Sequence, residues 1–224
     1  MRLKELKREL KMALGNREDL DSRLTQYINL AQTRLARSYD FSEMMRDWLT
    51  TLSLTQDKDT DRRIKVPQDL KHIQSVFVLD GASSLKLEYI SPRKWDFAIA
   101  LHEQLLTGKP ANYTMLGKEI LLWRVPETNY DVKVRYSAWP KELVREDDET
   151  DFDHKDDLIL LLAQIWAFQS LGETERANHA FSIFRGLLED AIRTDESFSD
   201  QKISIDGGFT PASGKYWADP FYKG

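Results

Sequence analysis

The chain has 224 residues, 41% of them hydrophobic and 31% charged, which are the proportions of a soluble globular protein with a well-hydrated surface. Its formal net charge of −5 argues against a protein that grips nucleic acid through the phosphates, and the absence of cysteine excludes disulfides and thiolate metal sites. No apolar run reaches the roughly 18 residues that span a bilayer, and no continuous apolar segment follows the basic N-terminus, so neither a membrane anchor nor a secretory signal is expected.

Two amphipathic helices are predicted near the N-terminus. Residues 2–14 place leucines at helical spacing, with five basic and two acidic side chains between residues 2 and 11, a local charge of +3. We interpret this segment as a surface helix packed on its own protein and ended by Gly15-Asn16; the alternative is contact with a membrane or an acidic partner. A second helix, capped by Asp19 or Asp21, is expected to carry an apolar stripe. The stripe consists of Leu20, Leu24, Ile28, Ala31 and Leu35.

A β-rich section is predicted from Trp48, where the period changes to two, as far as Pro140. The bulky residues Phe41, Met44, Met45 and Trp48 at its start are interpreted as the hinge where helices meet sheet. We expect about six strands and one short helix, which begins at Pro92. The expected strands are 50–54, 64–66, 73–79, 85–89, Glu119–Val125 and Tyr130–Ala138.

The last two of these strands are predicted to form a hairpin joined by residues 126–129, with a reverse turn near Gly117 before it. In the second strand, apolar and charged residues alternate, so one face is expected to be buried. The apolar set is Val132, Val134 and Tyr136, and the charged set is Asp131, Lys133 and Arg135.

The most charged stretch, residues 146–157, holds eight carboxylates and one lysine. Two helices follow, Lys155–Leu171 and Glu173–Arg193, and the single Gly172 between them predicts an αα-hairpin. The first helix is apolar nearly all round and is expected to be the central core helix. The last segment, 199–224, combines four glycines and two prolines with several aromatic side chains. Such a tail is expected to order itself on another surface, either a partner or its own domain.

These signals together predict an α+β fold. The N-terminal helices and the C-terminal αα-hairpin would form a small α-helical bundle with a β-rich insertion and an extended C-terminal tail. The expected divisions are 1–47 for the N-terminal helices, 48–154 for the β-rich insertion ending in the acidic loop, 155–198 for the helical hairpin and 199–224 for the tail.

No active site is recognisable. Phosphate-binding glycine loops and a G-x-S-x-G elbow are missing from the sequence, and the four histidines are scattered. We therefore predict no catalytic, cofactor-binding or metal-binding residue, and no enzyme. One alternative is a small metal-dependent hydrolase that uses the acidic stretch, in which His154 and its neighbouring aspartates could bind a hard cation. A second alternative is a monomeric β-rich binding module whose tail packs on itself.

The order of signals between Gly108 and Leu143 is G-x-P-x-x-Y, a strand ending at a proline, then Tyr130, V-x-V-x-Y and Pro140, followed by a charged loop and two long helices. This order resembles the head-to-tail adaptor proteins of tailed bacteriophages. The resemblance extends upstream to Leu20–Trp48 and Ile64–Val78 and covers residues 15 to 195 or thereabouts. The matching residues are structural and carry no chemistry.

The resemblance implies a structural protein of the virion. It would be one subunit of a ring, expected to hold twelve copies, between the portal protein and a tail or nozzle component. The ring would extend the channel through which the genome leaves, with DNA as a weakly contacted passenger, and would involve no cofactor and no membrane. The expected location is the neck of the virion, and the host cytoplasm during assembly.

Two sets of site residues accompany this interpretation. Adaptors of this family commonly send a C-terminal segment onto the portal, so the aromatic residues of the tail are expected to bind it: Phe209, Tyr216, Trp217, Phe221 and Tyr222. The acidic loop is expected to face the DNA channel, where like charge prevents the duplex from sticking; the alternative is plain solubility. The channel-facing residues would be Asp147, Asp148, Glu149, Asp151 and Asp153.

Overall fold

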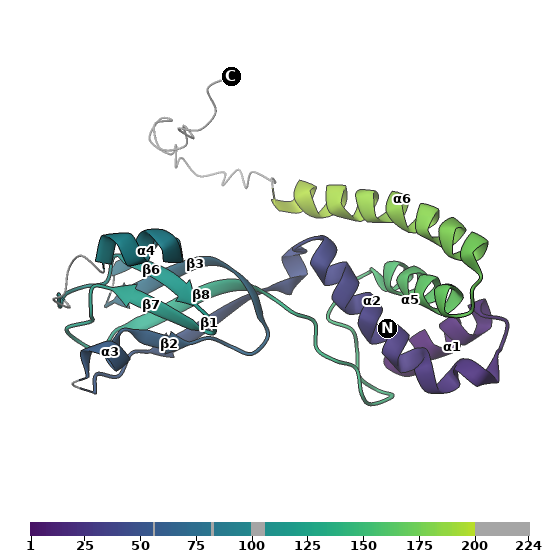
Figure 1. Cartoon of the computed structure of the whole chain (residues 1–224), viewed down its shortest axis with the longest axis horizontal. Coiled ribbons are helices and arrows are strands. Elements are labelled where there is room, and N and C mark those ends of the chain that lie inside the picture. The colour runs from purple at the N-terminus through teal and green to yellow at the C-terminus, as the bar shows by residue number, and fades with distance from the viewer. Residues whose placement is uncertain (56, 82, 100–105, 200–224) are drawn as a thin grey trace, which may run out of the picture.

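A computed structural model describes residues 1–55, 57–81, 83–99 and 106–199 of the chain. Helices gather at one end of the molecule and strands at the other (Figure 1). The predicted fold class, α+β, is therefore confirmed.

The described α-helices fall into two groups. Four build the helical end, and two short ones accompany the strands (Figure 1). The four are α1 (Leu3–Ala13), α2 (Leu24–Ser38), α5 (Asp156–Ser170) and α6 (Thr174–Ser199). The short ones are α3 (Lys58–Asp61) and α4 (Pro92–Ile99), and two 3₁₀ turns, η1 (Glu18–Arg23) and η2 (Ser42–Met44), flank α2.

The four long helices bury one hydrophobic core. Helix α5 contacts α1, α2 and α6, and it lies between α2 and α6. Its apolar residues therefore point to several neighbours at once, as its composition predicted, while each of the other helices buries a single stripe. Representative fully buried side chains are Leu6, Ile28, Leu35 and Ile159.

The boundaries of α1 and α2 test two details of the sequence interpretation. Helix α1 ends as expected, because Gly15 (φ 77°) and Asn16 (φ 57°) adopt left-handed conformations that stop it. The predicted cap of the second helix is wrong. Arg23 precedes α2, and the two candidate carboxylates are taken by nearby cations, Asp19 by Arg17 and Asp21 by Lys11.

Eight described strands form two four-stranded sheets. The first sheet has the order β1-β8-β3-β4 and is antiparallel throughout; the second has the order β2-β7-β6-β5, with β5 and β6 parallel. Val76 and Val134 of the first sheet share a second hydrophobic core with Ile120 and Leu122 of the second. The strands are β1 (Met45–Thr51), β2 (Arg63–Lys65), β3 (Leu70–Asp80), β4 (Ser83–Lys86), β5 (Glu88–Tyr89), β6 (Asn112–Leu116), β7 (Glu119–Trp123) and β8 (Asp131–Ala138).

The predicted hairpin across residues 126–129 is wrong. Strand β7 pairs with β6 through the turn at Gly117 (φ 62°), and with β2 on its other edge, whereas β8 lies between β1 and β3 in the first sheet. The reason is burial on both faces of β7: Ile120 and Leu122 face the shared core, while Leu121 packs on Trp95 of α4. Residues 126–129 therefore carry the chain from one sheet to the other.

Other differences concern where strands begin and end. Strand β1 starts at Met45 instead of residue 50, and the single strand predicted over residues 85–89 is two strands, β4 and β5, which belong to different sheets. The buried Leu87 lies at that crossing. The predicted alternation in β8 is correct, with Val132, Val134 and Tyr136 buried.

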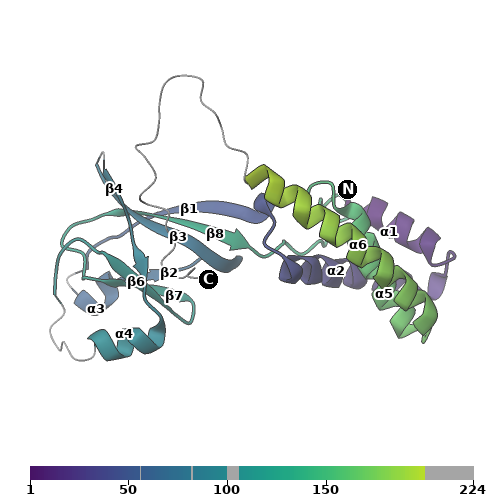
Figure 2. The same ribbon diagram turned by 90° about the horizontal axis from the view of Figure 1, so that it is seen from above.

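The strands join the helical end through one neighbouring pair. Strand β1 follows η2 directly, and β8 is the last strand before α5. The two strands pair with each other from Met45↔Ser137 to Thr51↔Asp131. Figure 2 shows both strands reaching side by side toward the helices. The chain thus enters and leaves the β-rich part at adjacent points.

Candidate functional site

The acidic stretch that follows β8 runs beside the first turn of α1. The backbone N–H of Leu3 donates to the carbonyl of Asp148 (2.8 Å), and that of Lys4 donates to the carbonyl of Glu146 (3.0 Å). The N–H groups of a first helical turn have no partner within their own helix, so the loop satisfies two of them. The loop and the N-terminal helix therefore hold each other in place.

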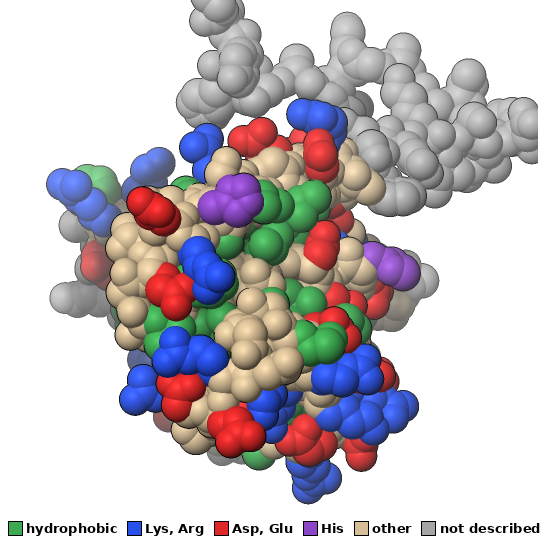
Figure 3. Space-filling model, turned by 90° about the vertical axis from the view of Figure 1, so that its right-hand side faces the viewer, with side chains coloured by type: hydrophobic (Ala, Val, Ile, Leu, Met, Phe, Trp, Pro, Cys, Tyr) green, Lys and Arg blue, Asp and Glu red, His purple; other side chains and the backbone are tan. Residues whose placement is uncertain are grey.

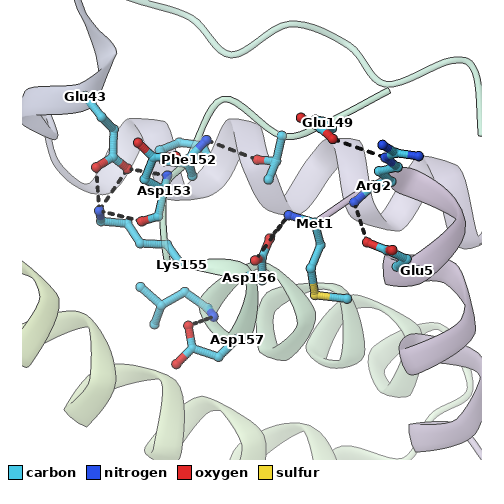
Figure 4. A network of polar contacts seen from close by, with 12 residues as sticks. Met1, Arg2, Glu5, Glu43, Glu149, Phe152, Asp153, Lys155, Asp156 and Asp157 are labelled. Atoms are coloured by element: carbon cyan, nitrogen blue, oxygen red, sulfur yellow. Dashed lines mark hydrogen bonds and ion pairs between the residues drawn. The ribbon is translucent and has the colours of Figure 1, made fainter. Parts of the chain in front are cut away.

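Side chains strengthen this contact, and Figure 4 shows part of the network. The basic face of α1 meets carboxylates of the loop, so the acidic group that this helix contacts belongs to the same chain. Four ion pairs join them: Lys4 with Asp147 (2.8 Å), Lys7 with Glu146 (2.7 Å), and Arg2 with both Glu149 (3.1 Å) and Asp147 (3.7 Å).

Local hydrogen bonds also shift the acidity of two loop residues. The hydrogen bond from Lys4 lowers the pKa of Asp147 below its ordinary value. The backbone N–H groups of Arg145 and Val144 donate to Asp148 at 2.8 and 2.9 Å, and they lower the pKa of that carboxyl. Both groups are therefore held in the charged form.

Asp151 and Asp153 lie near the junction between the two ends of the molecule. Asp151 accepts the backbone N–H of Lys141 (2.7 Å) and lies 3.6 Å from Arg46, while the backbone N–H of Asp153 donates to Glu43 (3.2 Å). The five residues expected to face a DNA channel thus lie on one loop but meet different local partners. Their orientation toward a channel stays a prediction.

In the described part of the chain, no group of three or more histidine or carboxylate side chains comes together as a metal site. His154 is exposed and adopts a left-handed conformation (φ 53°) next to Asp153. The described residues therefore offer nothing that favours the metal-dependent alternative.

A largely enclosed ion pair lies where η2 meets α5. The ammonium of Lys155 lies 2.7 and 2.8 Å from the two carboxylate oxygens of Glu43 (Figure 4). It also lies 4.6 Å from the centroid of the Phe41 ring. The two charged side chains are only 12% and 16% exposed. Asp195, in the last part of α6, accepts the backbone N–H and the hydroxyl of Ser42 in the same turn. The turn before β1 is thus fixed by α5 and α6 together.

The β-rich part is attached by a second group of contacts. The ammonium of Lys71 binds Asp40 (2.6 Å) and the carbonyl of Ala36 at the end of α2, and it lies 5.6 Å from the ring centroid of Trp139. Its side chain is 6% exposed. A buried cation with three such partners fixes how the first sheet meets α2.

A pocket of about 510 Å³ opens on the face of α2 that is turned away from α5. Polar side chains of α2 and the extended segment 140–142 line it, with Leu30 as an exposed apolar group. Gln32 also lines it and is 1% exposed; its Oε1 makes no hydrogen bond. The sequence interpretation missed this residue, although a glutamine between Ile28 and Leu35 in the apolar stripe is an available signal.

Helix α6 presents an outer face opposite the core. Asn178, Phe181, Ser182, Arg185 and Glu189 line a groove of about 420 Å³ along it. Phe181 is 48% exposed although it stacks on Phe184 (centroids 6.4 Å apart). An exposed aromatic residue in the lining of a groove marks a candidate contact surface.

The far tip of the helical end carries no dominant sign of charge in the view of Figure 3. Basic and acidic side chains are interspersed there, with hydrophobic patches between them. A face that grips nucleic acid has clustered basic residues, so this view shows none of the footprint expected of one.

The aromatic residues predicted to bind a portal, Phe209, Tyr216, Trp217, Phe221 and Tyr222, lie outside the described residues. Helix α6 ends at Ser199, and this C-terminal end is the one nearer to the β-rich part (Figure 1). The role of those five residues stays a prediction.

A protein-family model described as SU10 adaptor protein matches residues 1–204, which include every described helix and strand. No curated protein matches the chain. None of the described helices is long and apolar enough to cross a membrane.

Proposed function

Because the chain belongs to the SU10 adaptor protein family, a family of phage head-to-tail adaptors, we propose that it is a ring subunit between the portal and the tail. The observation that carries this proposal is the match over residues 1–204. In this role the protein is a structural component of the virion neck, assembled in the host cytoplasm. The ring has twelve copies, and it extends the channel for the genome and offers its other side to a tail or nozzle component.

The division of the chain into parts supports an assembly role. The helical part is the proposed bundle, in which α1 and α2 combine with an αα-hairpin of α5 and α6 around one core, and the β-rich part is its insertion. The contact of Lys71 in β3 with Asp40 joins the two parts, and the ion pair of Lys155 with Glu43 fixes the turn from which β1 starts. A rigid body of this kind suits a subunit that spaces two partners.

The proposed grip on the portal is the tail, residues 199–224, through its aromatic side chains. It follows directly after α6, so an anchored tail would pull on the end of a helix that Asp195 fixes to Ser42. Aromatic residues are frequent anchors in protein interfaces because they bury a large area in a single pocket.

The acidic loop faces the DNA channel in this proposal. Asp147 and Glu149 are 75% and 64% exposed even while paired. Arg2, Lys4 and Lys7 compensate part of the loop's charge. Such a surface holds a duplex weakly, because tight binding needs many basic contacts to phosphates. DNA is then a passenger.

The test is co-sedimentation with the portal ring encoded in the same genome, using the full chain and a chain ending at residue 198. We expect the full chain to travel with the portal and the shortened chain to stay behind. The shortened chain keeps both hydrophobic cores, and its melting temperature controls for misfolding. Binding by both chains would retain the adaptor role and reject the tail as the grip. Binding by neither at micromolar concentration would reject the adaptor role.

A further inference from the structure

Two surfaces of the helical part lie on opposite sides of α5. Helices α2 and α6 each pack on α5, and the outer face of each is turned away from it (Figure 1). One outer face carries the α2 pocket, and the other carries the groove along α6. Two surfaces placed in this way cannot meet within one chain, but they can meet between copies.

The α2 pocket contains a buried acceptor without a partner, and the network around it fixes which atom that is. The amide of Asn29 exchanges two hydrogen bonds with the backbone of Leu143: its Nδ2 donates to the carbonyl and its Oδ1 accepts the N–H, both at 2.9 Å. Gln32 must then turn its Nε2 toward Asn29 Oδ1 (3.1 Å). This leaves Gln32 Oε1 unpaired at the floor of the pocket, where a donor entering from outside would satisfy it.

The rim of the pocket adds one charge of each sign. Lys141 and Glu142 are exposed, and within the described residues neither side chain makes an ion pair or hydrogen bond. The backbone N–H of Lys141 binds Asp151, so the segment that carries these two charges is held in position.

The groove along α6 has matching chemistry. Phe181, Arg185 and Glu189 follow one another at intervals of four residues, so they form one stripe on the helix. All three are exposed, and the described residues provide no ion pair for Arg185 or Glu189. The stripe thus presents an aromatic ring, a guanidinium with five donors and a carboxylate in one line.

We propose that the α2 pocket of one copy receives the Phe181–Arg185–Glu189 stripe of a second copy. Arg185 then meets Glu142 and the unpaired Gln32 Oε1, Glu189 meets Lys141, and Phe181 covers the exposed Leu30. Opposite charges therefore face each other at two positions, and the buried acceptor gains a donor. This inference rests on the proposed ring and names the surfaces by which neighbouring subunits contact each other.

The positions of the two surfaces suit such a ring. A contact between different faces of identical subunits is head-to-tail, so each copy can bind one neighbour on each side. Such an arrangement closes into a ring when the rotation per copy permits it. A contact through one shared face would stop at a dimer.

The chain has no cysteine, so engineered thiols report the contact without background. We would prepare Gln26→Cys, at the pocket, and Ser182→Cys, beside the stripe, as separate full-length proteins, and oxidise their mixture. Both positions are exposed. The matched control replaces Ser182→Cys by Ile183→Cys, which is exposed on the same turn but lines a different pocket with Phe168. The mixtures are tested on portal rings and, at high concentration, without them.

We expect covalent dimers from the Gln26→Cys and Ser182→Cys mixture and few from the control. Arg185→Glu should lower the dimer yield by about tenfold or more, because it places like charges together, and Glu142→Arg in the partner protein should restore it. Cross-linking no greater than the control, both with and without the portal, would overturn the inference.

The two proposals fail in different ways. A chain that co-sediments with the portal but shows only control cross-linking retains the adaptor role and rejects this contact. A chain that does not bind the portal but cross-links at high concentration, with restoration by the charge exchange, retains this contact and rejects the portal role.

Discussion

Lys155 and Glu43 form an ion pair in which each side chain is almost enclosed, at 12% and 16% exposure. Removing one partner from such a pair leaves the other charge buried without compensation. A further group depends on Glu43, because this carboxylate also accepts the backbone N–H of Asp153. The pair therefore holds the start of α5 against the turn that leads into β1.

We expect Glu43→Ala to lower the free energy of unfolding by about 3 kcal/mol, with a similar loss for Lys155→Ala. The double variant should lose less than the sum of the two, since it leaves no unpaired charge. Urea titrations followed by circular dichroism measure these values. The control is Arg193→Ala, whose ion pair with Asp190 is 78% and 70% exposed and should contribute less than about 0.5 kcal/mol. Equal losses for Glu43→Ala and Arg193→Ala would contradict the expectation.

The lowered pKa values of folded-state carboxyl groups predict how stability depends on pH. The hydrogen bonds from Arg135 and then Lys133 lower the pKa of Asp47 well below its ordinary value of 3.8. A carboxyl with a lowered pKa binds fewer protons in the folded state than in the unfolded state, so stability rises with pH across that interval. The contribution of Asp47 is thus complete above about pH 5 and is lost as the pH falls below 3.8 toward its folded pKa.

The corresponding measurement is the free energy of unfolding at several pH values between neutral and strongly acidic. We expect the intact protein to lose stability steeply below about pH 4, where Asp147 and Asp148 contribute in the same direction. In Asp47→Asn the free energy of unfolding should fall less steeply at acidic pH, because residue 47 no longer takes up a proton when the chain unfolds. An equally steep fall in this variant would show that the pair with Arg135 is not formed in solution.

At the scale of single elements, predictability from sequence follows the number of faces that an element buries. Strand β8 buries one face, so its alternation of Val132, Val134 and Tyr136 gives both its type and its orientation. Strand β7 buries consecutive residues on both faces, so its pattern cannot tell which strand pairs with it. Because β8 is the next strand in the sequence, it is the predicted partner of β7. In the structure β7 pairs instead with β6, across the turn at Gly117.

Contacts between distant segments set the other limit. The leucine spacing of α1 is enough to predict the helix, but its partner loop lies 143 positions away at the Lys4–Asp147 pair. Charge alone shows that a basic helix and an acidic loop exist, and it does not show that they bind each other. Gln32 is similar: the apolar stripe reveals that it is buried, and only the fold shows that Asn29 takes just one end of its amide.

The same substitution, glycine to alanine, is expected to have opposite effects on stability in the turn between β6 and β7 and inside helix α6. Gly117 has a φ of 62° and open space where a Cβ would lie, so Gly117→Ala introduces backbone strain alone and should cost about 1 kcal/mol. Gly117→Asn should cost less, because asparagine tolerates this conformation. Gly186, inside α6, also has open space, and Gly186→Ala should stabilise by about 1 kcal/mol through helix propensity. Thermal unfolding of the three variants measures the expected loss of stability at Gly117 and the expected gain at Gly186. An unchanged stability of Gly117→Ala would mean that the turn has another conformation.

At the scale of the whole molecule, two hydrophobic cores are joined by a pair of strands. Residues before η2 and after β8 share the helical core, while the β-rich part has its own. Since Arg46 pairs with Tyr136, the ends left by removing the β-rich part are already neighbours. The helical part therefore has the connectivity of an independent folding unit.

We expect a chain in which Asn-Gly replaces residues 47–135 to keep a helical circular dichroism spectrum and to unfold cooperatively. An Asn-Gly turn suits the tight link between Arg46 and Tyr136. Its melting temperature should be lower than that of the intact protein, because the deletion removes Lys71 and its contacts with Asp40 and Trp139. A chain without cooperative unfolding would show that the helical core depends on the sheets.

The attachment through β1 and β8 also has a mechanical consequence. Helices α1 and α6 both belong to the helical core, so a tension applied between the two ends of the chain passes through that core. The β-rich part is attached through two adjacent strand ends and through Lys71 of β3, so it lies beside the segments that carry this tension. Tension applied to the tail is therefore resisted by the packing of α6 on α5. The two sheets carry none of this tension until the helices separate.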